Sequence, residues 1–269
     1  MSTHNEIVPP ASAPGGLSYI EQVTAIPCLR PRRPWVVGYS QERKAALIFQ
    51  PRCRSWSCPA CAEINRALWT FRIHYAAEVV INRGDTLTFV TITSHRRLSA
   101  SGSLRVFKDA WPKLRKRYRR ECPGAHYCLI PERHLSGTVH AHLLASASVG
   151  SRFWKDASAA CGLGYIAQEE PCTEPARAAW YVSKYLAKQL AGYRWPPGFR
   201  RVRCSRGFPR PPDPPVPGDW RFQFVGKAQE VSKVEQTFKS RGYVVLTPNH
   251  AEAWSIITLL ETVYADQTT

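Results

Sequence analysis

Acidic residues are scarce in this sequence. Its 269 residues include 20 Asp and Glu against 37 Lys and Arg, which gives a net charge of +17 and an isoelectric point near 9.8. A surplus of this size favours polyanionic partners, chiefly nucleic acid or an anionic membrane surface. The alternative, that the charge only keeps the protein soluble, is disfavoured because the basic residues are clustered.

Long apolar runs are also missing. No segment is apolar over the roughly 20 residues that a bilayer span needs. The segment Met1–Gly16 is polar and rich in Pro, Ala and Gly, without the basic-then-apolar order of a signal peptide. We therefore expect a soluble, cytoplasmic protein whose partner is nucleic acid. No Gly-rich loop ending in Lys-Ser or Lys-Thr is found, which argues against a fused helicase.

The hydrophobic fraction of 44% is large enough for a substantial core, so disorder of the whole chain is not expected. Periodicity and turn residues predict helices and strands between residues 63 and 264. The predicted helices are Glu63–Val80, Ser103–Arg120 and Ala176–Leu190, with a further one at Ala251–Tyr264 near the end of the chain. The predicted strands are Thr86–Thr93, His126–Pro131, Val139–Ala145, Phe222–Val225 and Tyr243–Leu246.

Nine cysteines, an odd number without a secretion signal, do not suggest a disulfide framework. Three of them, Cys53, Cys58 and Cys61, lie close together, and Cys58-Pro59-Ala60-Cys61 is typical of a zinc knuckle turn. We expect a structural Zn²⁺ site with Cys28 as the fourth ligand. The alternatives for that ligand are His74, Cys122 and Cys128.

Two other interpretations of the cysteines remain. They could be unpaired buried residues or a redox Cys-x-x-Cys pair, although no thioredoxin-like βαβ pattern surrounds them. A structural zinc would attach the N-terminal segment to the rest of the protein or present nearby side chains to DNA, namely Arg52, Arg54 and Trp56.

Basic side chains gather in two places. The end of the helix predicted at Ser103–Arg120 carries Lys113, Arg115, Lys116, Arg117, Arg119 and Arg120, which suit a phosphate-contacting surface or a solvated helix face. A Pro- and Arg-rich loop is predicted from Trp195 to Trp220. Its arginines alternate with aromatic residues, as in single-stranded DNA binding, or stiffen a surface loop: Arg194, Arg200, Arg201, Arg203, Arg206 and Arg210, with Trp195, Phe199 and Phe208.

The strand Val139–Ala145 contains the pair His140-Ala141-His142. Side chains at i and i+2 of a strand share a face, so both imidazoles project together and could bind a divalent metal. A hairpin register centred near Ser136 places Glu132 opposite His140 on that face. Two imidazoles and a carboxylate suit Mg²⁺ or Mn²⁺. Two surface histidines without a metal are the alternative.

The helix Ala176–Leu190 carries Tyr181 and Tyr185 one turn apart on the same face. Each is followed three residues later by a lysine, Lys184 and Lys188. A tyrosine can attack a phosphodiester if its proton is removed, and a nearby ammonium can stabilise the negative charge that develops. Core aromatics with lysines reaching to solvent would give the same pattern.

These segments occur in the order of a known set of motifs. The strand Leu87–Thr93, the strand His140-Ala141-His142 and the helix Tyr181–Lys188 resemble the three motifs of HUH endonucleases. The chain is most similar to rolling-circle replication initiators of bacterial phages and plasmids, of the two-tyrosine type. Relaxases differ, since they usually have a third histidine and an N-terminal tyrosine.

The resemblance implies an α+β fold with a central antiparallel sheet of about five strands in an RRM-like arrangement. It implies that His140 and His142 bind the catalytic metal and that Tyr181 and Tyr185 are nucleophiles. Glu132 would be the third ligand, with Glu169, Glu170 and Gln168 as fallback candidates.

The implied activity is site-specific nicking and rejoining of single-stranded DNA at a replication origin through a 5′-phosphotyrosine. A host DNA polymerase and helicase would then be partners, in the cytoplasm of a bacterial host. The alternatives are a tyrosine transposase of the same superfamily and a non-catalytic zinc-containing DNA-binding repressor. The expected division is a leader (1–17), a zinc segment (18–62), the nuclease domain (63–195), a loop (196–220) and an extension that packs on the nuclease domain (221–269).

Overall fold

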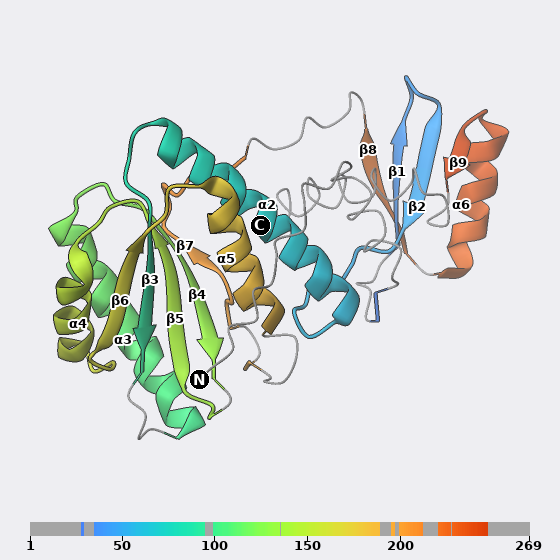
Figure 1. The fold of residues 1–269 in the computed structure, drawn as a ribbon. Coiled ribbons are helices and arrows are strands. Elements are labelled where there is room, and N and C mark those ends of the chain that lie inside the picture. Colours follow the sequence, from blue (N-terminus) through green and yellow to red (C-terminus); the bar gives the residue numbers. More distant parts are fainter. Residues whose placement is uncertain are drawn as a thin grey trace, which may run out of the picture. The chain divides into compact units, whose positions relative to one another are not determined.

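The computed structural model of the protein describes residues 28–29, 35–94, 99–134, 136–188, 195–196, 199–211, 220–226 and 228–246. The chain divides into two compact units, one formed by residues 1–67 and 212–269 and the other by residues 68–211 (Figure 1). The expected leader and the helix predicted at Ala251–Tyr264 lie outside the described residues. No helix in the described ranges has the length and apolar character required to cross a membrane.

The first unit contains a four-stranded sheet in the order β8-β1-β2-β9. Strands β1 (Trp35–Ser40) and β2 (Ala45–Phe49) form a hairpin, and β8 (Arg221–Gly226) pairs antiparallel with β1. Strand β9 (Val244–Leu246) runs parallel to β2.

Helix α6 (Ala228–Ser240) of this unit packs against the sheet, where Phe238 joins a buried cluster with Val37 and Ile48. The sequence divided these residues differently. The segment expected to be irregular contains β1 and β2, and the described part of the expected extension shares their sheet instead of forming a separate addition to the nuclease domain.

The second unit is built on a five-stranded antiparallel sheet in the order β6-β3-β5-β4-β7, which confirms the expected α+β class with such a sheet. Its strands are β3 (Thr88–Thr93), β4 (Tyr127–Arg133), β5 (Val139–Ala145), β6 (Ile166–Pro171) and β7 (Arg203–Cys204). Helix α3 (Ala100–Glu121) follows β3, and α4 (Gly150–Ala160) follows β5. The first four strands and these two helices have the β-α-β-β-α-β order of ferredoxin-like folds. Helix α2 (Pro59–Asn82) precedes them, and the division between the units falls within it.

The two faces of this sheet differ because successive strand residues point to opposite sides. On one face, Ala141 and Leu143 of β5 join the main core with Phe107 and Leu114 of α3 and with Trp154 of α4. On the other face lie the two histidines of β5 and helix α5 (Pro175–Lys188), whose tyrosines contact them. The alternation thus separates a dry core from a polar face covered by one helix.

The chain approaches itself closely at the end of the polar face. A Cβ atom at Gly164, just before β6, would collide with the backbone carbonyl oxygen of Thr93 at the end of β3. Thr93 and Ile166 are paired residues of the two strands. Glycine at position 164 therefore allows β6 to start beside the end of β3.

Replacing this glycine should destabilise the second unit. We expect Gly164→Ala to lower the free energy of unfolding by about 2 kcal/mol, because the backbone must move to admit the methyl group. Urea denaturation followed by circular dichroism measures the change. The control is Gly102→Ala in α3, whose methyl group would meet only the Ser99 hydroxyl at 3.0 Å. Equal losses from both substitutions would contradict the steric explanation.

Candidate functional site

The β4–β5 hairpin has the register expected from the sequence. Glu132 is the Cα partner of His140, and Ile130 is the partner of His142. On the other side of β5, Thr91 pairs with His142 and Thr93 with His140. Directly opposite residues of an antiparallel pair share a face, so the sheet places a carboxylate, two imidazoles and two hydroxyls together.

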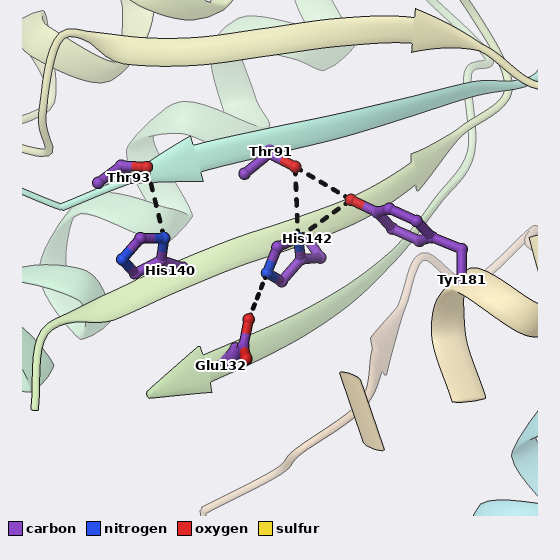
Figure 2. A network of polar contacts seen from close by, with 6 residues as sticks. All are labelled: Thr91, Thr93, Glu132, His140, His142 and Tyr181. Atoms are coloured by element: carbon purple, nitrogen blue, oxygen red, sulfur yellow. Dashed lines mark hydrogen bonds and ion pairs between the residues drawn. The ribbon is translucent and has the colours of Figure 1, made fainter. Parts of the chain in front are cut away.

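His142 is the centre of the polar network in Figure 2. It is only 3% exposed, and its Nε2 atom lies 2.8 Å from a carboxylate oxygen of Glu132. Its Nδ1 atom lies 3.0 Å from the hydroxyl of Tyr181 and 3.3 Å from the hydroxyl of Thr91. Glu132 was expected opposite His140, and that register is present, but its carboxylate reaches diagonally to His142.

The two tyrosines of α5 both contact this imidazole. The ring of Tyr185 stacks on the ring of His142 at a centroid distance of 3.5 Å, and the ring of Tyr181 lies edge-on at 5.8 Å. The two phenol rings are 4.7 Å apart. On its outer side Tyr181 packs against Phe89 of β3 at 4.2 Å. The predicted pair of tyrosines thus faces the predicted histidine.

Both phenols are held in the neutral form. Burial raises the pKa of Tyr181 above its ordinary value, although the hydrogen bond with Thr91 acts in the opposite direction. Burial also raises the pKa of Tyr185. Any reaction in which these oxygens act as nucleophiles must therefore include removal of the phenolic proton, for which His142 is the adjacent acceptor of Tyr181.

His140 lies on the same face but in a different local environment. Its Nδ1 atom is 3.4 Å from the Thr93 hydroxyl, and its ring stacks on His134 at 5.3 Å. Of the described residues, four cysteines alone bring three or more potential ligand atoms within 4.8 Å of one another. The donor types of Glu132, His140 and His142 suit a divalent ion, whereas their side chains are hydrogen-bonded to Tyr181 and to the threonines of β3.

The fallback acidic residues separate by strand alternation. Glu169 points to the opposite face, where its carboxylate accepts a hydrogen bond from Trp154 Nε1 at 2.9 Å. Glu170 and Gln168 are bonded to each other at 2.6 Å and pair with Phe89 and Thr91 of β3. Glu169 therefore does not belong to the polar face.

Lys184 and Lys188 were both expected to stabilise charge. Lys184 is exposed, and its ammonium lies 5.1 Å from the ring centre of Trp180 and 6.0 Å from that of Tyr185. It therefore lies nearer to Tyr185 than its spacing from Tyr181 suggested. Lys188 ends α5, and its side chain lies outside the described part.

Thr91 was not predicted as a site residue. Its hydroxyl lies 3.0 Å from that of Tyr181 and so connects β3 to α5. The alternation of Thr91 and Thr93 along the strand was a signal for it, because both threonines share a face.

The four cysteines form a compact cluster at the start of α2. Cys28 joins Cys53, Cys58 and Cys61, as expected, and the alternative ligands are not part of the group. Sulfur–sulfur distances are 3.5 Å for Cys53–Cys61, 3.6 Å for Cys28–Cys61 and 4.0 Å for Cys28–Cys58. Four sulfurs at about 2.3 Å around a tetrahedral zinc lie about 3.8 Å apart, so the donor set fits Zn²⁺.

The thiols of this cluster differ in acidity. Burial acts to raise the pKa of Cys58, but hydrogen bonds from the backbone N–H groups of Cys61 and Leu29 outweigh it and lower that pKa to about 7. Burial and the neighbouring thiols of Cys53 and Cys28 raise the pKa of Cys61. One thiolate forms readily, and a cation would stabilise the others.

The expected DNA-binding residues fall into two sets. The six basic residues of α3 are all exposed, and so is Arg200. Arg201 is only 7% exposed, and burial lowers its pKa to about 10, so its side chain is not at the surface where the expected DNA contact requires it. Arg203 is half-buried. Arg194 lies outside the described residues.

The aromatic residues of the Pro- and Arg-rich loop pack inward. Trp195 and Phe199 stack on each other at 4.2 Å and lie against the main core, and Phe208 is buried. These contacts favour the structural interpretation of this loop over a base-stacking surface.

Comparison with known proteins gives a match for the central part of the chain. Residues 86–190 match a family model of replication-associated proteins, the ORF2 family. The matched region extends from just before β3 to just after α5, so it contains the whole polar network of His142. The match supports a replication initiator of the Rep type. Searches of curated proteins and of solved structures gave no match.

The cysteine cluster makes a testable prediction about metal content. We expect the purified protein to contain one Zn²⁺ per chain and Cys28→Ala to lose it, because a structural site needs four ligands. Elemental analysis by mass spectrometry measures the content. Cys122→Ala is the matched control and should keep the ion. Protein purified with added zinc that contains almost none would contradict the prediction.

Proposed function

We propose that the protein is a rolling-circle replication initiator of the HUH type, which nicks and rejoins single-stranded DNA through a covalent 5′-phosphotyrosine. The observation that carries this proposal is the contact of two tyrosines on one helix with a histidine of the central sheet. Both rings meet His142, and the Tyr181 hydroxyl lies 3.0 Å from its Nδ1 atom. The family match over residues 86–190 supports it.

In the nicking step a phenolic oxygen attacks the scissile phosphorus. The bond from phosphorus to the 3′-oxygen breaks, the tyrosyl ester to the 5′-phosphate forms, and the departing 3′-oxygen takes up a proton. For Tyr181 the phenolic proton has an acceptor in His142 Nδ1, and Glu132 at Nε2 fixes the tautomer that leaves Nδ1 unprotonated. The bond energy is retained in the ester, so rejoining needs no nucleotide cofactor.

Mg²⁺ or Mn²⁺ bound by His140, His142 and Glu132 would polarise the scissile phosphate and neutralise its charge. The residues of the chain have further roles in this proposal. Thr91 holds the Tyr181 hydroxyl from the opposite side at 3.0 Å, which orients it before attack. Lys184, beside the ring of Tyr185, contributes positive charge near that second phenol.

Rejoining reverses the chemistry. A free 3′-hydroxyl attacks the phosphotyrosine, and the tyrosine leaves as a phenol. With a second tyrosine available, one phenol can hold a DNA end while the other cuts a regenerated junction. A host polymerase extends the 3′-hydroxyl between these events, and a host helicase separates the strands.

Substitution of the tyrosines tests the proposal. The probe is a set of single-stranded oligonucleotides that tile the DNA flanking the gene, labelled at the 3′ end and incubated with Mn²⁺. We expect a denaturant-resistant labelled protein band from the wild type, a reduced band from Tyr181→Phe or Tyr185→Phe, and none from the double substitution, because phenylalanine has no nucleophilic oxygen.

The control for this experiment is Tyr39→Phe in β1 of the other unit, which should form the adduct normally. Absence of an adduct from the wild type on every oligonucleotide would overturn the proposal and favour a non-catalytic DNA-binding repressor. Complete loss from one single substitution would show that only that tyrosine acts.

The carboxylate makes a separate prediction about the metal. We expect Glu132→Gln to raise the Mn²⁺ concentration needed for half-maximal adduct formation by about 10- to 100-fold, because a ligand that also orients His142 is weakened. A metal titration of adduct formation measures this shift. Glu170→Gln on β6 is the matched control and should shift it little. The same metal dependence in both variants would exclude Glu132 as a ligand.

A further inference from the structure

The second half of α3 carries a continuous basic surface, defined here as residues 113–120. Apart from the buried Leu114 and Tyr118, every residue from 113 to 120 is Lys or Arg, and all six basic side chains are exposed. None of the six forms an ion pair within the part of the chain that the structure describes. This surface is one helix face with a high density of uncompensated positive charge.

Helix stability does not account for this concentration of charge. Cations favour the last turn of a helix because of its dipole, which explains Arg119 and Arg120. The effect does not extend to Lys113, two turns before the end. The pairs 113/117, 115/119 and 116/120 are like charges at i,i+4, and each destabilises an isolated helix by a few tenths of a kcal/mol. The basic surface is therefore better explained by a polyanionic partner.

The basic surface lies behind the sheet as seen from the tyrosines. Leu114 and Tyr118 of α3 pack in the main core with Leu143 of β5. The next residue along the strand, His142, faces α5 on the other side. A DNA strand at Tyr181 therefore cannot contact α3 without passing around an edge of the sheet.

One sheet edge continues the positive charge. Arg203 of β7 pairs with Leu129 of β4, and its guanidinium lies 5.9 Å from the ring centre of Phe107 in α3. Burial lowers the pKa of Arg203, and the charges of Arg200 and Arg115 lower it further, so these guanidiniums lie close together. The basic surface thus extends from α3 to the edge strand.

We propose that this surface binds the phosphate backbone of double-stranded DNA next to the nicking site, as a second DNA-binding site separate from the one that holds the cut strand. The inference rests on the proposed nicking function. A duplex is favoured over a single strand because the surface offers charge without base-stacking rings. The nearby Trp195 and Phe199 stack on each other against the core, whereas single-strand sites display aromatic side chains to the bases.

The geometry of the helix suits a duplex backbone. Seven residues of rise along an α-helix cover roughly 10 Å, over which a duplex presents about six negative charges. Contacts of this kind read no sequence, so the surface would hold the DNA that flanks an origin while the strand at α5 is chosen by other contacts.

The test uses the full chain with both tyrosines changed to phenylalanine, so that binding is measured without nicking. The basic-surface variant is Lys113→Gln, Lys116→Gln and Arg120→Gln. The control removes three exposed positive charges from the other unit, by Arg221→Gln, Lys233→Gln and Arg241→Gln. Fluorescence anisotropy with a 30-base-pair duplex, over a series of salt concentrations, gives the affinity and its salt dependence.

We expect the basic-surface variant to bind the duplex at least 10-fold more weakly than the control. We also expect the slope of log affinity against log salt to fall by about 2 to 3, since each lost phosphate contact contributes about 0.9. With the tyrosines restored, adduct formation on a 12-nucleotide single strand should stay within about twofold of the control.

Three results would overturn the inference. Equal duplex binding by the variant and the control would show that the charge has no role in binding duplex DNA. An equal loss of affinity for single strands and duplex would make α3 part of the single-strand site. Unchanged duplex binding with lost binding to vesicles of anionic phospholipid would assign the surface to a membrane. Because duplex binding is read without cleavage, failure of the nicking proposal would leave this measurement interpretable.

Discussion

The hydrogen bond between the Tyr181 hydroxyl and His142 Nδ1, 3.0 Å long, is the contact on which the site depends. It forms only if the β4–β5 hairpin has its observed register and if α5 packs on the same face of the sheet. A slip of one residue would turn both histidines into the core. The buried residues between them, Val139, Ala141 and Leu143, therefore determine the position of the polar groups as much as the polar groups themselves.

The sheet also separates two kinds of interaction with DNA in our proposals. The polar face holds the groups that would react with one phosphate. The opposite face carries α3, whose apolar side fills the core and whose basic side remains exposed. The cysteine cluster belongs to the other unit, where four sulfur atoms lie within 4.8 Å of one another beside a small buried cluster.

Local patterns predicted the site better than they predicted the domain organisation. The hairpin, the strand of β5 and the helix with Tyr181 follow from residues close in sequence, and Cys28 was the one distant residue placed correctly in its cluster. Strands β1 and β2 were missed because Pro, Arg and Cys residues on both sides obscured their short apolar runs. Their pairing with β8 joins segments far apart in the sequence. The burial of Arg201 also depends on tertiary packing that its Arg-rich neighbourhood does not reveal.

The arrangement of the two phenols around one imidazole has a consequence for the order of events. The rings are 4.7 Å apart, and both touch His142. Two phosphodiesters are too bulky to be seated at this single imidazole at once. If the protein nicks DNA as proposed, the helix itself enforces turn-taking: one junction has to vacate the imidazole before the next can be cut, and no separate timing device is needed.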